Sequence, residues 1–362
     1  MSRVWIAAAV IVYLFVVGCA LIGRTSESKT SIERHASTRT SATRPVGDLL
    51  PIRAIGIQLQ RVDWMDKYKL CIDEIADVGA DGVKLVIDTR QENGSSSKIF
   101  IDQRYAPSAD GLVDLIKYAK SKNLRVVVMP IVLLDKPRGG EWRGQIKPES
   151  WDAWWNSYRD MLSHFAWLSQ SGGADVFVVG SELVSTEEFT DQWRETIEHV
   201  RTIFSGLLTY SSNWDHYGGI EWWDDLDLIS MNSYWKLGSN KDASVDEIKK
   251  NWQKIEDEVM TFARRKKKKL FFTEVGWCSL ANAATEPWDY TRSSVKLDLE
   301  LQARLYEGFF QHWHGNPDLA GFSIWAWDPG EGGVEDRGYT PKNKPAEKVL
   351  RDWLAKDAWK VD

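Results

Sequence analysis

The sequence contains few of the residues that build metal centres and disulfide frameworks. Its 362 residues include three cysteines and six histidines. Three cysteines cannot form the set of bridges that holds a small secreted domain together. None of the histidines follows an expected strand in a metal-binding arrangement, and the chain has no phosphate-binding glycine loop, zinc spacing or serine nucleophile elbow. These absences favour chemistry that needs neither a metal nor a cofactor.

A basic surface is missing as well. The formal net charge of the chain is −6. Residues 1–50 hold six basic and three acidic side chains, a net charge of +3, which leaves −9 for residues 51–362. An acidic body repels polyanions, and we therefore exclude nucleic acid as the main partner.

Tryptophan, in contrast, is abundant. The chain has 20 Trp residues, and apolar types make up 43% and charged types 27% of the sequence. This balance is typical of a globular protein with a large core and excludes a disordered or collagen-like chain. So many indoles predict either an aromatic core or a surface that binds the flat, partly apolar faces of sugar rings.

Residues 1–23 predict an export or anchoring segment. Residues 4–23 carry no charge and are flanked by Arg3 and Arg24. This length is sufficient for a transmembrane helix, and a basic start before an apolar stretch is also typical of a secretory signal. The segment Val16–Cys19 resembles the lipobox of bacterial lipoproteins, in which Cys19 is lipidated after cleavage. An anchor, a lipoprotein and a secreted protein remain as alternatives, and all three place the body outside the cytoplasm.

Residues 24–50 predict a disordered linker. They are rich in Ser, Thr and Arg and have few large apolar side chains, so they cannot bury enough surface to fold. We therefore expect one folded domain, residues 51–362, tethered to a membrane through the N-terminus.

Apolar runs alternate with helical periodicity along that domain. Several runs are nearly continuous in β-branched and aromatic residues, which is typical of parallel strands covered on both faces. The expected strands are 52–59, 82–88, 124–134, 174–181, 206–211, 225–234, 268–275 and 319–327. Eight such strand–helix units predict an α/β fold, a (β/α)8 barrel. The main rival is a doubly wound open sheet, but the glycine-rich turn that such a sheet usually has after its first strand is missing.

The helices between these strands are expected to pack aromatic stripes against the sheet. One stripe comprises Trp151, Trp154, Trp155 and Tyr158, and another includes Trp193. This spacing accounts for many of the tryptophans as core residues.

Two glutamates stand at the ends of apolar strands. Glu182 follows the fourth strand and Glu274 ends the seventh. Active sites of (β/α)8 barrels lie at the carboxyl ends of the strands, where both side chains would point into the barrel mouth. Two carboxylates about 5–5.5 Å apart suit a retaining glycosidase, in which one is the general acid/base and the other the nucleophile. The plain alternative is that each glutamate forms a salt bridge with a neighbouring loop.

Neighbouring strand ends provide further candidates. Tyr234 and Asn232 alternate on the sixth strand, where Tyr234 would hold the nucleophile ionised and Asn232 would bind a sugar hydroxyl. Trp325 and Trp327 alternate on the eighth strand and would form an apolar floor for a pyranose, and Asn213 follows the fifth strand. The alternative interpretation of these side chains is that they fill the interior layers of the barrel.

With these residues placed, residues 52–356 resemble clan A glycoside hydrolases and are most similar to glycoside hydrolase family 113, whose known members are β-1,4-mannanases. The similar segments are Trp142–Gly144 with the helix that follows, Gly180–Leu183, Phe272–Trp277 and Gly338–Glu347. The resemblance implies that Glu182 is the acid/base and Glu274 the nucleophile. It also implies that Trp142, Arg143 and Trp277 contact substrate.

The chain also departs from the clan pattern. Ser181 stands where many clan members have Asn, and Ile131 follows Pro130 where the family often has His. A long Ser-rich segment, residues 90–108, follows the second strand and is expected to reshape the cleft.

The sequence therefore predicts a retaining hydrolase that cleaves a β-linked hexose polysaccharide such as β-1,4-mannan by a double displacement. The alternative is a non-catalytic glycan-binding barrel at the cell surface. A polysaccharide or oligosaccharide is the expected partner, and the working expectation for the oligomeric state is a monomer.

Overall fold

The computed structural model describes residues 49–239, 241–291 and 294–356. The expected signal or anchor, Cys19 and nearly all of the linker lie outside these residues. Among the described residues, no helix has both the length and the apolar character that a membrane crossing requires.

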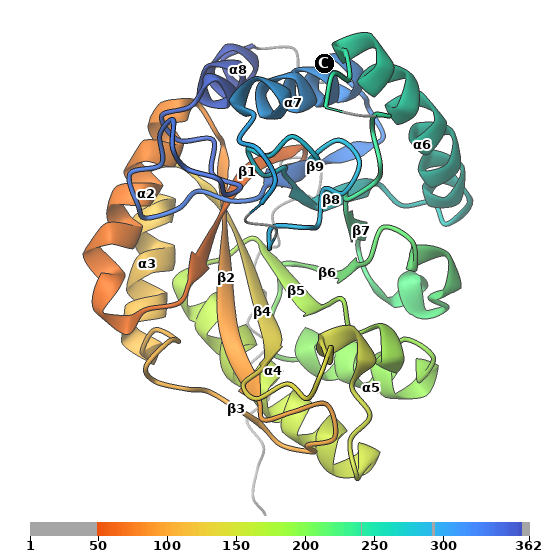
Figure 1. The fold of residues 1–362 in the computed structure, drawn as a ribbon. Helices are drawn as coiled ribbons and strands as arrows, with labels where there is room; N and C mark the ends of the chain where they lie inside the picture. The colour runs from red at the N-terminus through yellow and green to blue at the C-terminus, as the bar shows by residue number, and fades with distance from the viewer. Residues whose placement is uncertain (1–48, 240, 292–293, 357–362) are drawn as a thin grey trace, which may run out of the picture. The chain divides into compact units, whose positions relative to one another are not determined.

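Eight parallel strands form a closed barrel (Figure 1). Strand β1 pairs with β2 on one side and with β9 on the other, which closes the ring. The prediction of a barrel is therefore confirmed, and an open sheet is excluded. The strands are β1 (Ile52–Leu59), β2 (Gly82–Gln91), β4 (Arg125–Leu134), β5 (Val176–Ser181), β6 (Leu207–Ser212), β7 (Ile229–Asn232), β8 (Leu270–Val275) and β9 (Leu319–Ile324). A short strand β3 (Ile99–Phe100) adds antiparallel to the end of β2.

Helices cover the outside of the ring. They are α2 (Met65–Val78), α3 (Ala109–Ser121), α4 (Trp151–Gly172), α5 (Thr190–Arg201), α6 (Val245–Arg265), α7 (Leu299–Trp313) and α8 (Pro345–Leu354). The side chains of Ser108, Ser150, Ser244 and Asp298 cap four of them by accepting a backbone N–H three residues further on. Such caps satisfy donors that have no partner inside a helix, and they fix where each helix begins.

Several strand boundaries differ from the sequence prediction. Strand β7 begins at Ile229 instead of residue 225, because Trp222–Asp225 form a 3-10 turn. The connection from β6 to β7 consists of this turn and a second one, Tyr217–Gly219, in place of an α-helix. Strand β9 ends at Ile324, so the segment that contains Trp325 and Trp327 is a loop.

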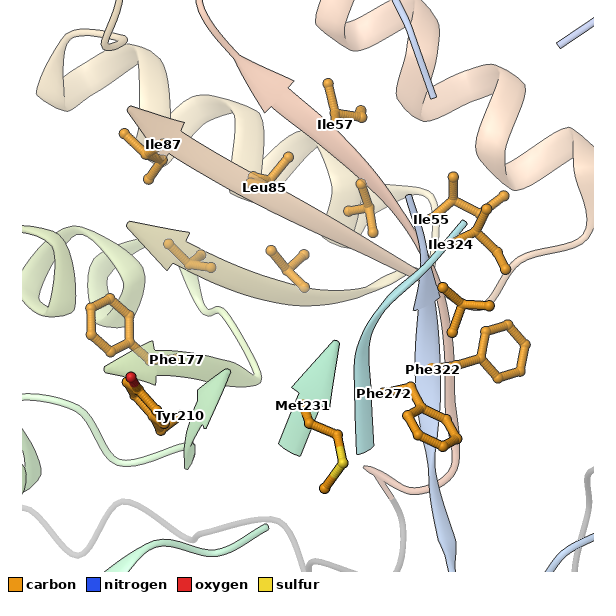
Figure 2. Packing of buried hydrophobic residues seen from close by; sticks show 14 of the residues in the cluster. Ile55, Ile57, Leu85, Ile87, Phe177, Tyr210, Met231, Phe272, Phe322 and Ile324 are labelled. Carbon is orange, nitrogen blue, oxygen red and sulfur yellow. The ribbon is translucent and has the colours of Figure 1, made fainter. Parts of the chain in front are cut away.

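The larger apolar layer lies between the strands and the helices. Alternate strand residues point outward into it, as Figure 2 shows for Ile55, Ile57, Leu85, Ile87, Phe177, Tyr210, Met231, Phe272, Phe322 and Ile324. The predicted aromatic stripes pack into the same layer: Trp154, Trp193 and Trp252 are fully buried. Many tryptophans are thus structural.

The barrel interior changes from apolar to polar along its axis. Ala54, Val127 and Phe271 belong to an inner apolar cluster. Nearer the carboxyl ends of the strands, hydroxyl groups bond across the ring: Ser211 Oγ lies 2.6 Å from Thr273 Oγ1. This polar layer supports the rim that carries the two glutamates.

Substitution of Leu85 tests how much the packing of the outer apolar layer contributes to stability. Its side chain is fully buried, whereas Leu70 on α2 is 55% exposed. We expect Leu85→Ala to lower the free energy of unfolding by about 2–5 kcal/mol, because it leaves a cavity between β2 and the helices. The matched control, Leu70→Ala, should change it by less than about 0.5 kcal/mol. Urea unfolding of both variants measures the difference, and equal effects would contradict this account of the packing.

Candidate active site

Glu182 stands on a tight turn directly after β5. Its φ of +54° is left-handed, a conformation that side chains other than Gly rarely adopt. Two hydrogen bonds hold the turn: the Glu182 N–H donates to the Ser211 carbonyl oxygen at 2.9 Å, and the Leu183 N–H donates to the Tyr210 hydroxyl at 2.8 Å. The turn is therefore fixed by the neighbouring strand β6, which aims the carboxyl group at the barrel mouth.

The Glu182 carboxyl group is held from two sides. Asn232 Nδ2 donates to Oε1, and Arg143 Nη2 donates to Oε2. Burial raises the pKa of this carboxyl group; the Arg143 charge works against that rise, and the nearby Glu274 adds to it. The net result is a carboxyl group that retains its proton to higher pH than an exposed glutamate.

Glu274, in β8, has different surroundings. The Tyr234 hydroxyl donates to its Oε2 at 2.7 Å, and Lys84 Nζ lies 3.8 Å from its Oε1. Lys84 itself is fully buried and donates to the Thr273 carbonyl oxygen at 2.6 Å. Burial lowers the pKa of Lys84 to about 8, while Glu274 and Glu182 act to raise it. The carboxyl group of Glu274 thus faces a hydroxyl donor at one oxygen and an ammonium group at the other.

The two glutamates share one rim of the barrel. Asn232 pairs in register with Glu274 across β7 and β8, and the same Asn232 side chain donates to Glu182. One amide thus connects the two positions, which lie 92 residues apart in the chain. The structure brings together Glu182, Glu274, Tyr234, Asn232 and Arg143.

Three other expected binding residues border this cluster. Asn213 Oδ1 accepts a hydrogen bond from Asn232 Nδ2 at 3.1 Å. The half-buried Trp325 has its ring centroid 4.9 Å from Lys84 Nζ, so its indole lies close to the Glu274 carboxylate. Trp142 is 37% exposed and lies so close to Gly144 that a Cβ there would come within 2.2 Å of the indole. The glycine allows Trp142 to lie against the loop that carries Arg143.

Trp277 and Trp327 require a correction. Trp277 is fully buried and packs edge-on against Tyr306 of α7, with ring centroids 5.1 Å apart. Trp327 is 2% exposed, and its Nε1 donates to Glu74 of α2 at 2.7 Å. Both indoles belong to the outer packing layer, where no substrate can reach them. The alternation expected for Trp327 fails because β9 ends before it.

The prediction omitted Lys84 and Asp88, which both point inward from β2. Lys84 interrupts the apolar run 83–87, and a charged residue inside such a run was the available signal. Asp88 is also buried; its carboxylate accepts from Gln58 Nε2 at 2.8 Å and from Arg90 Nη2 at 3.3 Å. Burial raises the pKa of Asp88.

The Ser-rich segment after β2 docks on the loop that carries Trp142 and Arg143. The Gly94 N–H donates to Glu141 Oε2 at 3.2 Å, and the Lys147 N–H donates to the Gly94 carbonyl oxygen at 2.7 Å. Through these bonds the segment supports the loop from which Arg143 reaches Glu182.

A second buried carboxyl group, Glu187, lies behind the Glu182 turn. Tyr210 donates to Glu187 Oε1 at 2.8 Å while accepting from the Leu183 N–H. Burial raises the pKa of Glu187 to about 7, although the Tyr210 hydrogen bond acts to lower it. Glu187 therefore orients the hydroxyl that holds the Glu182 turn.

Glu187 makes stability depend on pH. Its ordinary pKa is 4.5 and its folded pKa is about 7, so between these values the folded state binds more protons than the unfolded state. The free energy of unfolding consequently falls as pH rises through this window. Glu187→Gln cannot ionise and still accepts from Tyr210. We therefore compare the free energy of unfolding of this variant with that of the wild type by urea unfolding. The variant's value minus the wild-type value should increase by up to about 3 kcal/mol from pH 4.5 to 7.

The control for this prediction is Glu188→Gln, because Glu188 is the exposed neighbour on the same loop. Its stability relative to the wild type should be independent of pH. A difference between Glu187→Gln and the wild type that stays constant across the window would contradict the assignment.

The arrangement suits hydrolysis of a glycosidic bond. A closed parallel barrel presents, at the carboxyl ends of its strands, one carboxyl group with a raised pKa and another that accepts from Tyr234 beside the Lys84 ammonium group. No group of three His, Cys, Asp or Glu side chains among the described residues is placed to hold a metal ion. Fold and site together define a glycoside hydrolase.

The comparisons identify the family. The model of Glycoside Hydrolase Family 113 matches residues 55–344, and the chain belongs to this family. A solved GH113 β-mannanase from Alicyclobacillus acidocaldarius, AaManA, shares 29% identity with a TM-score of 0.77, over 86% of this chain and 99% of that one. A GH113 β-1,4-mannanase shares 25% identity with a TM-score of 0.75, over 84% of this chain and 98% of that one. A search of curated protein sequences gave no match.

More distant structures share only the fold. A Faecalibacterium prausnitzii β-glucuronidase is 13% identical with a TM-score of 0.57, and the match covers 84% of this chain and 49% of the glucuronidase.

Proposed function

We propose that this protein is a retaining β-1,4-mannanase in which Glu182 is the general acid/base and Glu274 is the nucleophile. The observation that carries this proposal is the placement of two glutamates on one rim with opposite surroundings. One is buried so that its pKa rises, and the other accepts from Tyr234 beside the Lys84 ammonium group.

The reaction would take place in two steps. In the first, Glu182 gives its proton to the glycosidic oxygen while a Glu274 oxygen attacks the anomeric carbon, so that the sugar–oxygen bond breaks and a glycosyl ester forms. In the second, ionised Glu182 removes a proton from water, the water oxygen attacks the same carbon, and the ester bond to Glu274 breaks. Two inversions retain the configuration of the anomeric centre.

The surrounding residues support these roles. Tyr234 and Lys84 stabilise the negative charge on Glu274 before attack and when it leaves as a carboxylate. Arg143 and Asn232 fix the rotamer of Glu182. Trp325 offers an apolar surface beside Glu274, on which the C–H face of a pyranose would rest.

The substrate assignment follows the family. Two of the similar solved structures are described as β-mannanases or β-1,4-mannanases, and each match covers nearly the whole of those chains. A β-1,4-linked mannan or manno-oligosaccharide is therefore the proposed substrate. The alternative, a non-catalytic glycan-binding barrel, has no need for a carboxyl group with a raised pKa beside a second, stabilised carboxylate.

We also propose that the enzyme acts outside the cytoplasm, with residues 1–23 as signal, lipoprotein signal or anchor. The uncharged stretch between Arg3 and Arg24 supports this placement. If the wild type incorporates radiolabelled palmitate and Cys19→Ala does not, this result would support lipidation of Cys19.

Rescue by azide distinguishes the two glutamate roles. Glu274→Ala and Glu182→Ala should each lower kcat on mannan by at least about a thousandfold. With an activated aryl β-mannoside, azide should restore turnover of Glu274→Ala and give the α-mannosyl azide, because azide attacks from the face that the carboxylate occupied. With Glu182→Ala, azide should give the β-mannosyl azide, because it attacks the glycosyl ester on Glu274.

The exposed Glu188 provides the control, since Glu188→Gln should retain wild-type activity. Near-full activity of either alanine variant, or azide products of the opposite configurations, would refute the assignment. Circular dichroism spectra establish that the variants are folded.

Arg143 sets the alkaline limit of activity. Glycosylation requires protonated Glu182, so activity falls as pH rises through the Glu182 pKa. Arg143 acts to lower this pKa, against the dominant effect of burial. Arg143→Met should therefore move the alkaline limb of the kcat/KM profile to higher pH. The control is Arg194→Met, at an exposed arginine paired with Asp225, which should leave the profile unchanged. A shift of the alkaline limb to lower pH in Arg143→Met would contradict the argument.

A further inference from the structure

A run of six consecutive basic residues, 264–269, has no part in the proposed reaction. It begins in the last turn of α6 and ends directly before β8. Glu274 lies near the other end of that strand. The run therefore lies at the amino-terminal end of the barrel, opposite the rim that carries the two glutamates.

Half of this run has no anionic partner. The other half is occupied: Arg264 pairs with Asp318 at 2.8 Å, Lys266 pairs with Asp224 at 3.3 Å, and Lys268 donates to backbone carbonyl oxygens. Arg265, Lys267 and Lys269 alternate with these residues and are exposed. We call these three residues the basic patch, and no carboxylate in the described part of the chain pairs with them. The dipole of α6 attracts cations to its last turn, but Lys267 and Lys269 stand beyond that turn.

Other cations at this end of the barrel are paired. Their partners are carboxylates on neighbouring elements: Asp81 for Arg53 and Arg125, Asp175 for Lys120, and Asp227 for Arg201. The basic patch is therefore a local excess of positive charge on an acidic body.

A pocket of about 630 Å³ adjoins the patch. Arg265 and Lys267 line it, and Arg265 Cζ lies 5.2 Å from the ring centroid of Phe262. Gly218 and Gly219 line it as well, with open space where a Cβ would stand. The pocket also contains the carboxylates of Glu221 and Asp224, of which Asp224 is paired with Lys266. The cations thus border a hollow beside the connection from β6 to β7, where an α-helix is replaced by short turns.

The chain enters the barrel at the same end. Leu49, the first described residue, is buried in the inner apolar cluster together with Leu207 and Leu228. Leu207 begins β6 and Leu228 directly precedes β7, so this part of the cluster closes the amino-terminal end of the ring. The proposed signal or anchor is therefore joined to the body at the end that carries the basic patch. A tether raises the effective concentration of a nearby surface, so weak contacts suffice to hold the body there.

We propose that the basic patch binds the phosphate groups of anionic phospholipids. The body would then lie on the membrane with its amino-terminal end, and the rim with Glu182 and Glu274 would face the polysaccharide outside. Lys and Arg side chains near an anionic bilayer are attracted to its surface, and salt screens this attraction. The inference rests on the proposed attachment to a membrane and is independent of the roles of the two glutamates.

Lysine acetylation measures how closely this end approaches the bilayer. The full chain is placed in lipid nanodiscs of phosphatidylcholine alone, or of equal parts phosphatidylcholine and phosphatidylglycerol, and a water-soluble acetylating reagent is followed by mass spectrometry. Lys267 and Lys269 should react about fivefold more slowly on the anionic discs, and high salt should remove the difference. Lys136, an exposed lysine beyond the carboxyl end of β4, should react equally on both discs.

Substitution shows whether the patch itself is responsible. The triple variant carries Arg265→Gln, Lys267→Gln and Lys269→Gln, and Lys266 remains as the reporter. In the wild type Lys266 should react more slowly on the anionic discs, and in the triple variant it should react equally on both. The matched control removes the same kinds of cation from exposed positions in the first halves of α5 and α6, by Arg194→Gln, Lys250→Gln and Lys254→Gln. This control should retain the wild-type difference.

Each other result has a defined meaning. Equal reaction of Lys267 and Lys269 on both discs would overturn the proposal, and so would a Lys266 difference that persists in the triple variant. If inorganic phosphate alone slows both lysines on neutral discs, the patch is a site for a free anion, and the membrane proposal is again overturned.

Loss of the membrane attachment itself is recognised separately. If the full chain does not stay on neutral discs, the proposed attachment fails, and flotation with phosphatidylglycerol vesicles decides the patch. Flotation that is lost in the triple variant would support lipid binding, and absence of flotation in the wild type would refute it. Hydrolysis of mannan by the same preparation tests the catalytic proposal independently.

Discussion

The structure depends on holding two carboxyl groups close together with little of either side chain exposed to solvent. Like charges at short range oppose each other, and burial makes each ionisation more costly. The barrel meets this constraint with two cations, Arg143 at Glu182 and the fully buried Lys84 at Glu274, and with the neutral donors of Asn232 and Tyr234. The partners are unequal, so the two carboxyl groups differ in their electrostatic surroundings. Two chemically identical side chains thus stand in different surroundings, as the proposed division into acid and nucleophile requires.

Closure of the barrel makes this arrangement possible. Glu182 leaves β5, Asn232 ends β7, Glu274 belongs to β8 and Lys84 to β2, so the site draws on opposite parts of the ring. In an open sheet β2 and β8 would lie far apart, because four strands separate them in the order β8-β7-β6-β5-β4-β2. The pairing of β1 with both β2 and β9 brings Lys84 within 3.8 Å of Glu274. The hydroxyl groups below, such as Ser211 and Thr273, give this rim a polar base.

Sequence periodicity predicted the ring and its two glutamates because both depend on local patterns. A run of apolar residues that ends in Glu indicates a strand and the position of a rim residue at the same time. The pattern failed where the backbone departed from a regular strand. Trp327 lies beyond the end of β9, so the expected two-residue alternation no longer determines its direction. Trp277, which the resemblance rather than a strand pattern had suggested, follows the end of β8 and packs on α7. The charge of Lys84 inside an apolar run was a local signal, but its partner Glu274 lies across the ring, and no local pattern encodes that contact.

The 20 tryptophans show how one residue type serves two purposes in this fold. Trp154, Trp193 and Trp252 stand at helical spacing and are fully buried, so their large apolar surfaces stabilise the outer layer. Trp142, Trp214, Trp288 and Trp325 stand on loops at the carboxyl ends of the strands and keep part of their surface accessible. The row from Trp252 through Trp235 to Trp214 joins the two groups. Because packing in the core orients an indole at the rim, the same contacts that stabilise the barrel also shape the surface that a polysaccharide would meet.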